Sequence, residues 1–298
     1  MTPLLVPLPG NEHLAQALAQ AMDAEVGQLA IRRFPDEETY LRYDTPVAQR
    51  SVGLVCTLDR PDDKVLPLLF AAAAARDLQA ARVGLIAPYL AYMRQDRRFQ
   101  PREAITSNYF AKLLSERVDW LVTVDPHLHR HTSLAEIYSV PTRVLHAAPL
   151  ISEWIRRDVE RPLLIGPDSE SEQWVAAVAG DAGAPHLVLH KVRHGDRDVE
   201  VTVPEVARWL DHTPVLIDDI ISTGRTMAET IVHLIRRGMK PPVCIGVHGL
   251  FAGDALNGLL KAGAGRVITT NTVPHATTAI DIAPRLAVDV RAVLKTVA

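Results

Sequence analysis

The segment VLIDDIISTGRTM, residues 215–227, is compatible with few folds because it joins a short apolar run directly to a pair of acids. The apolar run 215–217 is typical of a buried strand, and an amphipathic helical pattern begins at the turn 222–226. A buried strand, a loop and a helix N-terminus, in that order, present backbone N–H groups and the positive end of the helix dipole to an anion. The segment therefore predicts an α/β fold with an anion site after this strand.

The chemistry of the turn suits a sugar phosphate. Its residues are mostly small or hydroxyl-bearing: Ser222, Thr223, Gly224, Arg225 and Thr226. Small residues let the backbone wrap a phosphate, and Gly224 permits a tight turn. Asp218 and Asp219 stand outside this phosphate cup and suit the vicinal hydroxyls of a ribose. The alternative is an ordinary strand-to-helix connection in which serine and threonine cap the helix.

Length and composition narrow the class of protein. The chain has 298 residues, enough for two domains, and its hydrophobic content of 48% is ordinary for a globular protein. A net charge of -3 argues against nucleic acid or an anionic membrane as a partner. Cys56 and Cys244 lie in apolar runs, which fits a reducing compartment, and the pattern indicates neither a leader nor a membrane span. We expect a cytoplasmic enzyme.

Strand and helix patterns alternate along the whole chain, as in parallel α/β sheets. An Ala-rich helix is predicted for Asp62–Asp77 and a buried strand for Trp120–Val124. This alternation of strands and helices begins a second time near Ala147. We therefore predict an N-terminal domain over residues 1–146 and a C-terminal domain over residues 147–298, each a mainly parallel sheet flanked by helices.

Two further polar segments carry candidate binding groups. One is a turn of an aromatic residue, a proline and three acids: Phe34, Pro35, Asp36, Glu37 and Glu38. The other is PYLAYMRQDR, residues 88–97. Its arginines can form bidentate hydrogen bonds with phosphate, and its neighbouring polar groups can hydrogen-bond a base. Taken alone, each segment is more typical of a solvated turn or loop.

In this order, the segments resemble the ribose-phosphate diphosphokinase (phosphoribosyl pyrophosphate synthetase) family, whose two domains have the Rossmann-like fold of type I phosphoribosyltransferases. The pattern Pro-Tyr-x-x-Tyr-x-Arg-Gln-Asp-Arg is close to one that this family carries and simple phosphoribosyltransferases lack. The resemblance implies a set of ATP-binding residues: Phe34, Asp36, Glu37, Glu38, Arg94, Gln95, Asp96 and His127. Glu37 stands where the family usually has glycine.

The same resemblance assigns the loop of the opening segment to ribose 5-phosphate. The implied binding residues are Arg193, Asp218, Asp219, Ser222, Thr223, Gly224, Arg225 and Thr226. Ser222 replaces a usual Asp, and Arg225 replaces a small residue. Losing an acid and gaining a base should strengthen the attraction for phosphate.

Histidines follow the predicted strand Trp120–Val124, at positions 127, 129 and 131. Three histidines at alternate positions are also a pattern of zinc sites. The resemblance favours a different interpretation, in which His127 helps to hold Mg²⁺ on the phosphates of ATP. It implies that Asp168, after the predicted strand Leu163–Gly166, is the second magnesium residue, although Glu170 and Ser171 replace the glycines that usually follow.

Lys191 and Arg193 follow the predicted strand His186–His190 and are two residues apart. On an extended segment, residues with this spacing project to the same side, so both cations can contact one phosphate chain. A solvated hairpin is the alternative. The resemblance implies that Lys191 and Arg193 are catalytic residues on a mobile loop.

The function implied is transfer of the diphosphoryl group of Mg-ATP to ribose 5-phosphate, which gives 5-phosphoribosyl 1-diphosphate and AMP for nucleotide biosynthesis. Mg²⁺ is the expected cofactor, and a homodimer or larger homo-oligomer is expected because the family shares its adenine site across subunits. Two alternatives are a phosphoribosyltransferase and a non-catalytic regulatory homologue of the synthetase.

Overall fold

The computed structural model of the chain forms two compact units, which are described separately. It describes residues 2–128, 130–166, 172–194, 198–202 and 206–297, with the backbone alone for 190–194 and 198–202. Unit 1 comprises Met1–Leu145, Thr272–Pro274 and Ile282–Ala298, and unit 2 comprises His146–Asn271 and His275–Asp281. Among the described residues, no helix is long and apolar enough to cross a membrane.

Unit 1 is built on a six-stranded parallel sheet in the order β2-β1-β5-β6-β7-β8. A separate antiparallel hairpin is formed by β3 and β4. The strands are β1 (Leu4–Pro7), β2 (Glu25–Val26), β3 (Leu29–Arg33), β4 (Thr39–Tyr43), β5 (Ser51–Val55), β6 (Arg82–Ala87), β7 (Trp120–Val124) and β8 (Thr142–Leu145). The helices are α1 (Glu12–Met22), α2 (Asp62–Asp77), α3 (Thr106–Ser115), a 3₁₀ turn (Leu134–Glu136) and α8 (Ala283–Thr296).

Helix α2 shows why the sequence folds as it does locally. Two acids, Asp62 and Asp63, occupy its first turn and Arg76 its last, which complements the helix dipole at both ends. Alanines supply the highest helix propensity in between. The helix spans Asp62–Asp77, so the sequence prediction for this element is confirmed.

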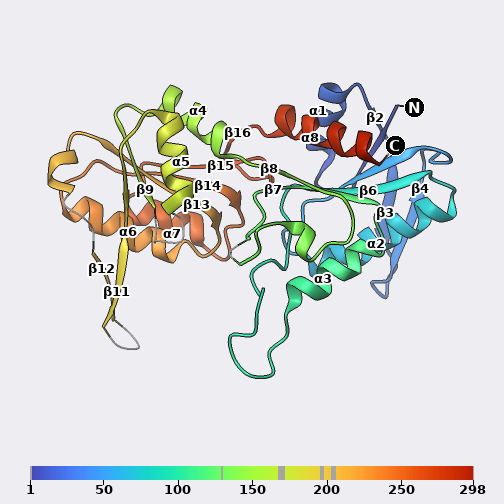
Figure 1. Cartoon of the computed structure of the whole chain (residues 1–298), viewed down its shortest axis with the longest axis horizontal. Helices are drawn as coiled ribbons and strands as arrows, with labels where there is room; N and C mark the ends of the chain where they lie inside the picture. The colour runs from blue at the N-terminus through green and yellow to red at the C-terminus, as the bar shows by residue number, and fades with distance from the viewer. Residues whose placement is uncertain (1, 129, 167–171, 195–197, 203–205, 298) are drawn as a thin grey trace. The chain divides into compact units, whose positions relative to one another are not determined.

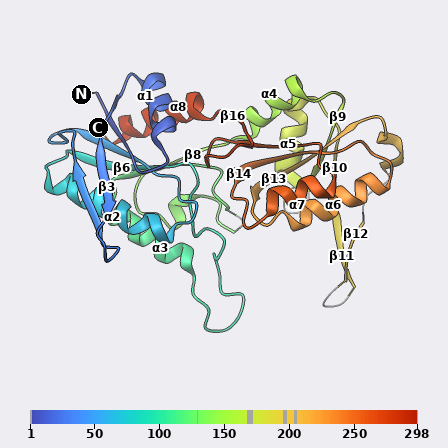
Figure 2. The ribbon, with the colours of Figure 1, turned by 180° about the vertical axis from the view of Figure 1, so that it is seen from behind.

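Helix α8 belongs to unit 1 although it ends the chain. It packs beside α1, and both lie on the same face of the first sheet (Figures 1 and 2). The guanidinium of Arg291 donates to the carbonyl of Ala21, and Thr57 Oγ1 donates to the carbonyl of Thr272 at 2.6 Å. The predicted C-terminal domain, residues 147–298, therefore differs from unit 2, because the returning chain buries its apolar side against α1.

Unit 2 is built on a second six-stranded parallel sheet in the order β10-β9-β13-β14-β15-β16. Its antiparallel hairpin, β11 and β12, extends away from the sheet (Figure 1). The strands are β9 (Pro162–Gly166), β10 (His186–Val188), β11 (His190–His194), β12 (Asp198–Thr202), β13 (Thr213–Ile221), β14 (Val243–Gly249), β15 (Arg266–Thr270) and β16 (Thr278–Ile280). The helices are α4 (Ala148–Asp158), α5 (Glu172–Ala182), a 3₁₀ turn (Val206–Trp209), α6 (Arg225–Arg236) and α7 (Ala255–Ala262).

The two units share one strand topology. In each unit, the second strand of the sheet pairs with one side of the first strand. A hairpin follows, and the next strand of the sheet pairs with the other side of the first strand. The order β2-β1-β5 in unit 1 thus corresponds to β10-β9-β13 in unit 2. This confirms the predicted fold class of two α/β domains with parallel sheets.

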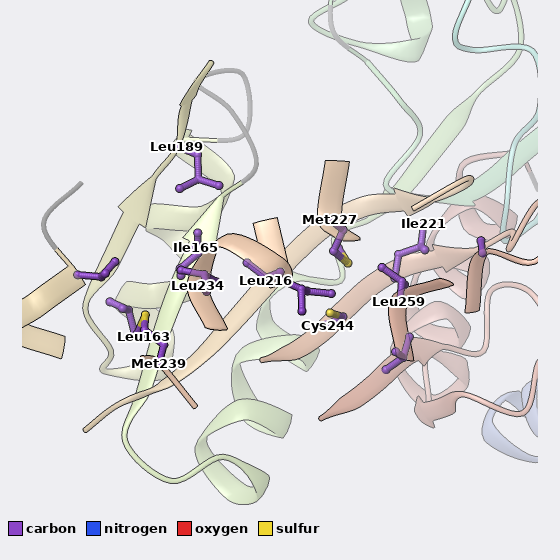
Figure 3. Close-up of a cluster of buried hydrophobic side chains, with 14 of the residues drawn as sticks. Leu163, Ile165, Leu189, Leu216, Ile221, Met227, Leu234, Met239, Cys244 and Leu259 are labelled. Carbon is purple, nitrogen blue, oxygen red and sulfur yellow. The ribbon is translucent and has the colours of Figure 1, made fainter. Parts of the chain in front are cut away.

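The core of unit 2 lies between its sheet and helices α6 and α7 (Figure 3). Ile165, Leu216 and Cys244 come from three neighbouring strands, and each is at most 3% exposed. Leu234 of α6 and Leu259 of α7 are fully buried against them. This packing fixes the start of α6 relative to the end of β13, where the candidate sugar-phosphate loop lies.

Candidate functional site

Strands β9 and β13 form a topological switch point in unit 2. The two strands are parallel neighbours, and the sheet continues from β9 to β10 on one side and from β13 to β14 on the other. In open parallel sheets, ligands bind outside the carboxyl ends of the strands at such a point. The pairing of β13 with β9 ends at Leu216, whereas its pairing with β14 continues to Ile221. Asp218 and Asp219 therefore lie beyond the last β9 pair, at the carboxyl end.

The acid pair lies within β13 rather than after it. Asp218 Oδ1 accepts a hydrogen bond from the backbone N–H of Asp219 at 2.9 Å. Both residues are partly exposed, in contrast to the buried residues on either side. The strand thus holds two carboxylates at an accessible edge of the sheet.

The loop after β13 is held by its backbone. The carbonyl of Ile221 accepts from the N–H groups of Leu250 and Phe251, both at 3.0 Å, and the carbonyl of Ser222 accepts from Ala252 at 3.0 Å. These bonds anchor the loop to the segment that follows β14. The position of the loop therefore depends on backbone hydrogen bonds to residues 250–252.

Gly224 is the N-cap residue of α6. Its φ of 66° is left-handed, and no side chain caps the helix. The alternative of a helix capped by Ser222 or Thr223 is therefore not what the structure shows. The first turn of α6 therefore has no side-chain cap, an arrangement that favours an anion at a helix N-terminus.

The predicted catalytic pair lies on the hairpin of unit 2. Lys191 pairs with Val201 and Arg193 with Val199 in the register of β11 and β12. The segment is an extended strand rather than a loop, and the predicted strand His186–His190 is divided between β10 and β11. The side chains of Lys191 and Arg193, and the whole of Asp168, lie outside the described residues.

The acidic turn of unit 1 closes the β3–β4 hairpin. The N–H of Phe34 donates to the carbonyl of Glu38 at 2.8 Å, and the N–H of Glu37 donates to that of Phe34 at 2.9 Å. Glu37 has a left-handed φ of 69°. This is the conformation that glycine adopts most readily, at the position where the family usually has glycine.

The side chains of this turn face solvent. Phe34 is 40% exposed, and Asp36, Glu37 and Glu38 are also exposed. The guanidinium carbon of Arg32 lies 4.8 Å from the ring centroid of Phe34 and 4.1 Å from that of Tyr40, and the two rings meet edge to face. The hairpin itself is tied to α2 through the hydroxyl of Tyr43, which donates to the carbonyl of Ala71 at 2.8 Å.

Other predicted ATP-binding residues follow β6 and β7, which are adjacent and parallel. Gln95 is held at the start of α3, where its Oε1 accepts from Thr106 Oγ1 at 3.1 Å and its carbonyl accepts from the N–H of Ser107. Asp96 is bound by Arg130, a residue of the segment after β7 that also contains His127. The structure thus brings the Arg94–Asp96 and His127–Arg130 segments to the same edge of the first sheet.

Comparisons with known proteins identify the family. Residues 4–117 match the profile of the N-terminal domain of ribose phosphate pyrophosphokinase, and residues 133–282 match that of the phosphoribosyl transferase domain. The ribose-phosphate pyrophosphokinase of Methanopyrus kandleri is 33% identical over 277 residues, which are 92% of this chain and 94% of that protein. The chain belongs to the ribose-phosphate pyrophosphokinase family.

Further ribose-phosphate pyrophosphokinases align along nearly the whole chain. The protein of Methanothermobacter thermautotrophicus is 32% identical over 95% of this chain and 98% of its own length. The crystal structure of phosphoribosylpyrophosphate synthetase from Mycobacterium smegmatis superposes with a TM-score of 0.86 at 28% identity, covering 99% of this chain and all of that one. Both the fold and the family predicted from the sequence are confirmed.

In this ribose-phosphate pyrophosphokinase family member, the switch point of unit 1 is closed by its own side chains. The N–H of Thr57, after β5, donates to Oδ1 of Asn11, after β1, at 2.8 Å. Both residues are 2% exposed, and the hydroxyl of Thr57 also accepts from the N–H of Tyr89. In unit 1, buried hydrogen bonds therefore join the strand ends at the switch point, whereas the predicted ATP-binding residues Arg94–Asp96 and His127 follow β6 and β7.

The histidine cluster does not appear as a zinc site in the part of the chain that is described. His129 lies outside that part, and His131 Nδ1 lies 2.8 Å from Oε2 of Glu136. Within the described ranges, no group of three or more His, Cys, Asp or Glu side chains is placed to hold a metal by itself. Hydrogen bonds from Thr132 and from His131 lower the pKa of Glu136 to about 2.

Arg130 and Thr106 are contacts that the sequence analysis did not assign. Arg130 follows His127 in a polar segment, and Thr106 ends the segment 102–106, which continues the resemblance to the family. The signal that could have found them is topological, because residues after adjacent parallel strands meet at one edge.

Proposed function

We propose that this chain transfers the diphosphoryl group of Mg-ATP to the anomeric hydroxyl of ribose 5-phosphate, giving 5-phosphoribosyl 1-diphosphate and AMP. The observation that carries the proposal is the loop after β13, where two accessible acids are followed by the left-handed Gly224 and a helix without a side-chain cap. Membership of a family of enzymes named for this reaction supports it.

The sugar phosphate would be held by two kinds of group. Asp218 and Asp219 would accept hydrogen bonds from the ribose hydroxyls, and the backbone of residues 222–226 would bind the 5-phosphate. Ser222 leaves the phosphate cup with one acid fewer than the family pattern, and Arg225, which is exposed at the first helical position, adds a positive charge. Both differences favour an anion.

The nucleotide would be bound by residues of unit 1. Arg94 and Gln95 would offer a guanidinium and an amide at the edge of the first sheet, beside the segment of His127, and the largely buried carboxylate of Asp96 lies next to them. The exposed turn Phe34–Glu38 would contribute an aromatic face and acids to an adenine held by a second subunit. We therefore also propose a homodimer or larger homo-oligomer, which sedimentation at working concentration would test.

Mg²⁺ is the cofactor that we propose, bound together with ATP. Mg²⁺ is usually bound by one or two protein groups together with phosphate oxygens and water, so a closed protein cage is not required. His127 and Asp168 would hold it, and when bound it would neutralise and align the phosphates.

The two cysteines are buried and free, which supports a reducing, cytoplasmic location.

The chemical difficulty is charge. The anomeric oxygen of ribose 5-phosphate attacks the β-phosphorus of ATP and loses its proton to solvent. The bond from that phosphorus to the α–β bridging oxygen breaks, and negative charge develops on the departing AMP. Lys191 and Arg193 would stabilise this charge, and the anion sites of both substrates would hold the reacting atoms in line. No covalent intermediate with the protein is needed.

The test is AMP formation from ATP and Mg²⁺, with phosphorus NMR of the sugar product. We expect AMP only with ribose 5-phosphate, together with a diphosphate on the anomeric carbon. Ribose without its phosphate tests the loop 222–226, and 2-deoxyribose 5-phosphate tests the acid pair; both should be much poorer substrates. Magnesium-dependent ATP binding without AMP would indicate the regulatory homologue, and base-dependent diphosphate release would indicate a phosphoribosyltransferase.

A further inference from the structure

An ion pair joins the two segments of unit 1 that carry the proposed nucleotide-binding residues. Arg130 Nη1 lies 2.9 Å from Oδ1 and 3.0 Å from Oδ2 of Asp96. Asp96 follows β6 and Arg130 follows β7, so the pair spans two neighbouring strand ends. One guanidinium nitrogen thus contacts both carboxylate oxygens.

The burial of the pair is unequal. The side chain of Asp96 is only 3% exposed, whereas that of Arg130 is 38% exposed. A carboxylate removed from water to this extent is costly unless a cation and hydrogen bonds compensate it. Arg130 provides that compensation, so the position of the Asp96 side chain depends on it.

Arg130 also contacts the loop between β6 and α3 at a second point. Its guanidinium carbon lies 5.7 Å from the ring centroid of Phe99, and that of Arg97 lies 5.0 Å from the same ring. Phe99 is itself fixed through its N–H, which donates to Oε2 of Glu103 at 2.7 Å. Contacts to both Asp96 and Phe99 let Arg130 hold the loop against the segment after β7.

We propose that Arg130 is a positioning residue for the nucleotide site: it orients the buried carboxylate of Asp96 and neutralises it, so that the ATP polyanion can approach. This inference rests on the proposed function, in which Asp96 binds ATP. His127 lies three residues before Arg130, so the ion pair also holds the candidate ligand groups of two strands in one arrangement.

The first test compares Arg130→Gln with Arg130→Lys. Loss of a charged hydrogen bond at a buried carboxylate should raise KM for ATP about ten- to hundredfold in Arg130→Gln, with a much smaller change in kcat. Arg130→Lys keeps the charge and should recover most of the affinity. Arg143→Gln removes an equal charge from an exposed position on β8 and should leave KM unchanged.

The second test combines Arg130→Gln with Asp96→Asn in one variant. If Arg130 acts through Asp96, Arg130→Gln should change KM by no more than about twofold in the Asp96→Asn background. An equal fold-change in both backgrounds, or an unchanged KM in Arg130→Gln with native Asp96, would overturn the inference. The double variant carries no unpaired buried charge. If Arg130→Gln alone unfolds, the double variant is compared with Asp96→Asn, and a change in KM of more than about twofold overturns the inference.

Calorimetric titration with ATP separates this inference from the proposed function. If the wild type makes no AMP but binds ATP, the proposed reaction fails, and the same ATP affinities still decide the role of Arg130. If the wild type makes AMP and Arg130→Gln binds ATP normally, only the inference fails. A wild type that neither binds ATP nor makes AMP overturns both.

Discussion

Gly224 packs directly against Leu259, across the start of helix α6. A Cβ placed on Gly224 would lie 3.3 Å from Cδ2 of Leu259, and the φ of Gly224 is 66°. The glycine is therefore constrained twice, by a left-handed backbone and by a close neighbour in the buried core shown in Figure 3.

Gly224→Ala should lower the free energy of unfolding by about 1–2 kcal/mol, because an L residue in the left-handed region costs about that much. It should also weaken ribose 5-phosphate binding, since the phosphate cup depends on this turn. Urea unfolding and the KM for ribose 5-phosphate measure the two effects. Gly180→Ala is the matched control: it lies in α5 with nothing within 4 Å of an added Cβ, and it should stabilise by up to about 1 kcal/mol. Stabilisation by both variants would contradict this account.

Lys191→Ala should lower turnover by roughly two to four orders of magnitude, the loss typical of removing one essential electrostatic donor. The measurement is AMP formation at saturating ATP and ribose 5-phosphate. Lys240→Ala removes the same charge from an exposed position in unit 2 and should retain full turnover. Unchanged turnover in Lys191→Ala would exclude a catalytic role for this residue.

Glu37→Gly should be neutral or stabilise the chain by up to about 1.5 kcal/mol. Relief of the left-handed φ gains about 1–2 kcal/mol, and the extra freedom of glycine in the unfolded chain offsets about 0.5–1 kcal/mol of it. The neighbouring Glu38 does not have a positive φ, so Glu38→Gly should destabilise by about 0.5–1 kcal/mol. Denaturant midpoints of the two variants test this difference in sign, and equal shifts would refute it.

Glu136 should make stability depend on pH in the acid range. Hydrogen bonds from Thr132 and His131 lower the pKa of Glu136 in the folded chain from 4.5 to about 2. Because the folded pKa is the lower one, the stabilisation is fully present above about pH 4.5 and is lost as the pH falls towards 2. The difference in urea midpoint between the wild type and Glu136→Gln should therefore shrink over this range. A difference that does not change with pH would show that this carboxylate is not held by these bonds.

Local chemistry accounts for the elements that were predicted well from the sequence. Helix α2 carries its own end signals, and strand β7 is a short apolar run between polar segments; both match their predicted bounds. The loop 222–226 was also predictable, because a buried strand, two acids and a glycine at a helix start specify a strand–loop–helix unit within a few residues. These features depend on neighbours in the sequence.

Contacts between distant residues decided the rest. No local pattern indicates that α8 returns to pack on α1, that Asn11 and Thr57 close the switch point of unit 1, or that Arg130 reaches Asp96. The left-handed conformation of Glu37 likewise depends on closure of the β3–β4 hairpin. The sequence by itself determined the fold class, the family and the strand–loop–helix unit at residues 215–227, since these follow from short-range patterns in a fixed order. The tertiary structure alone decided which buried charges and hydrogen bonds meet, because burial and pairing arise only when separate strands bring their ends together.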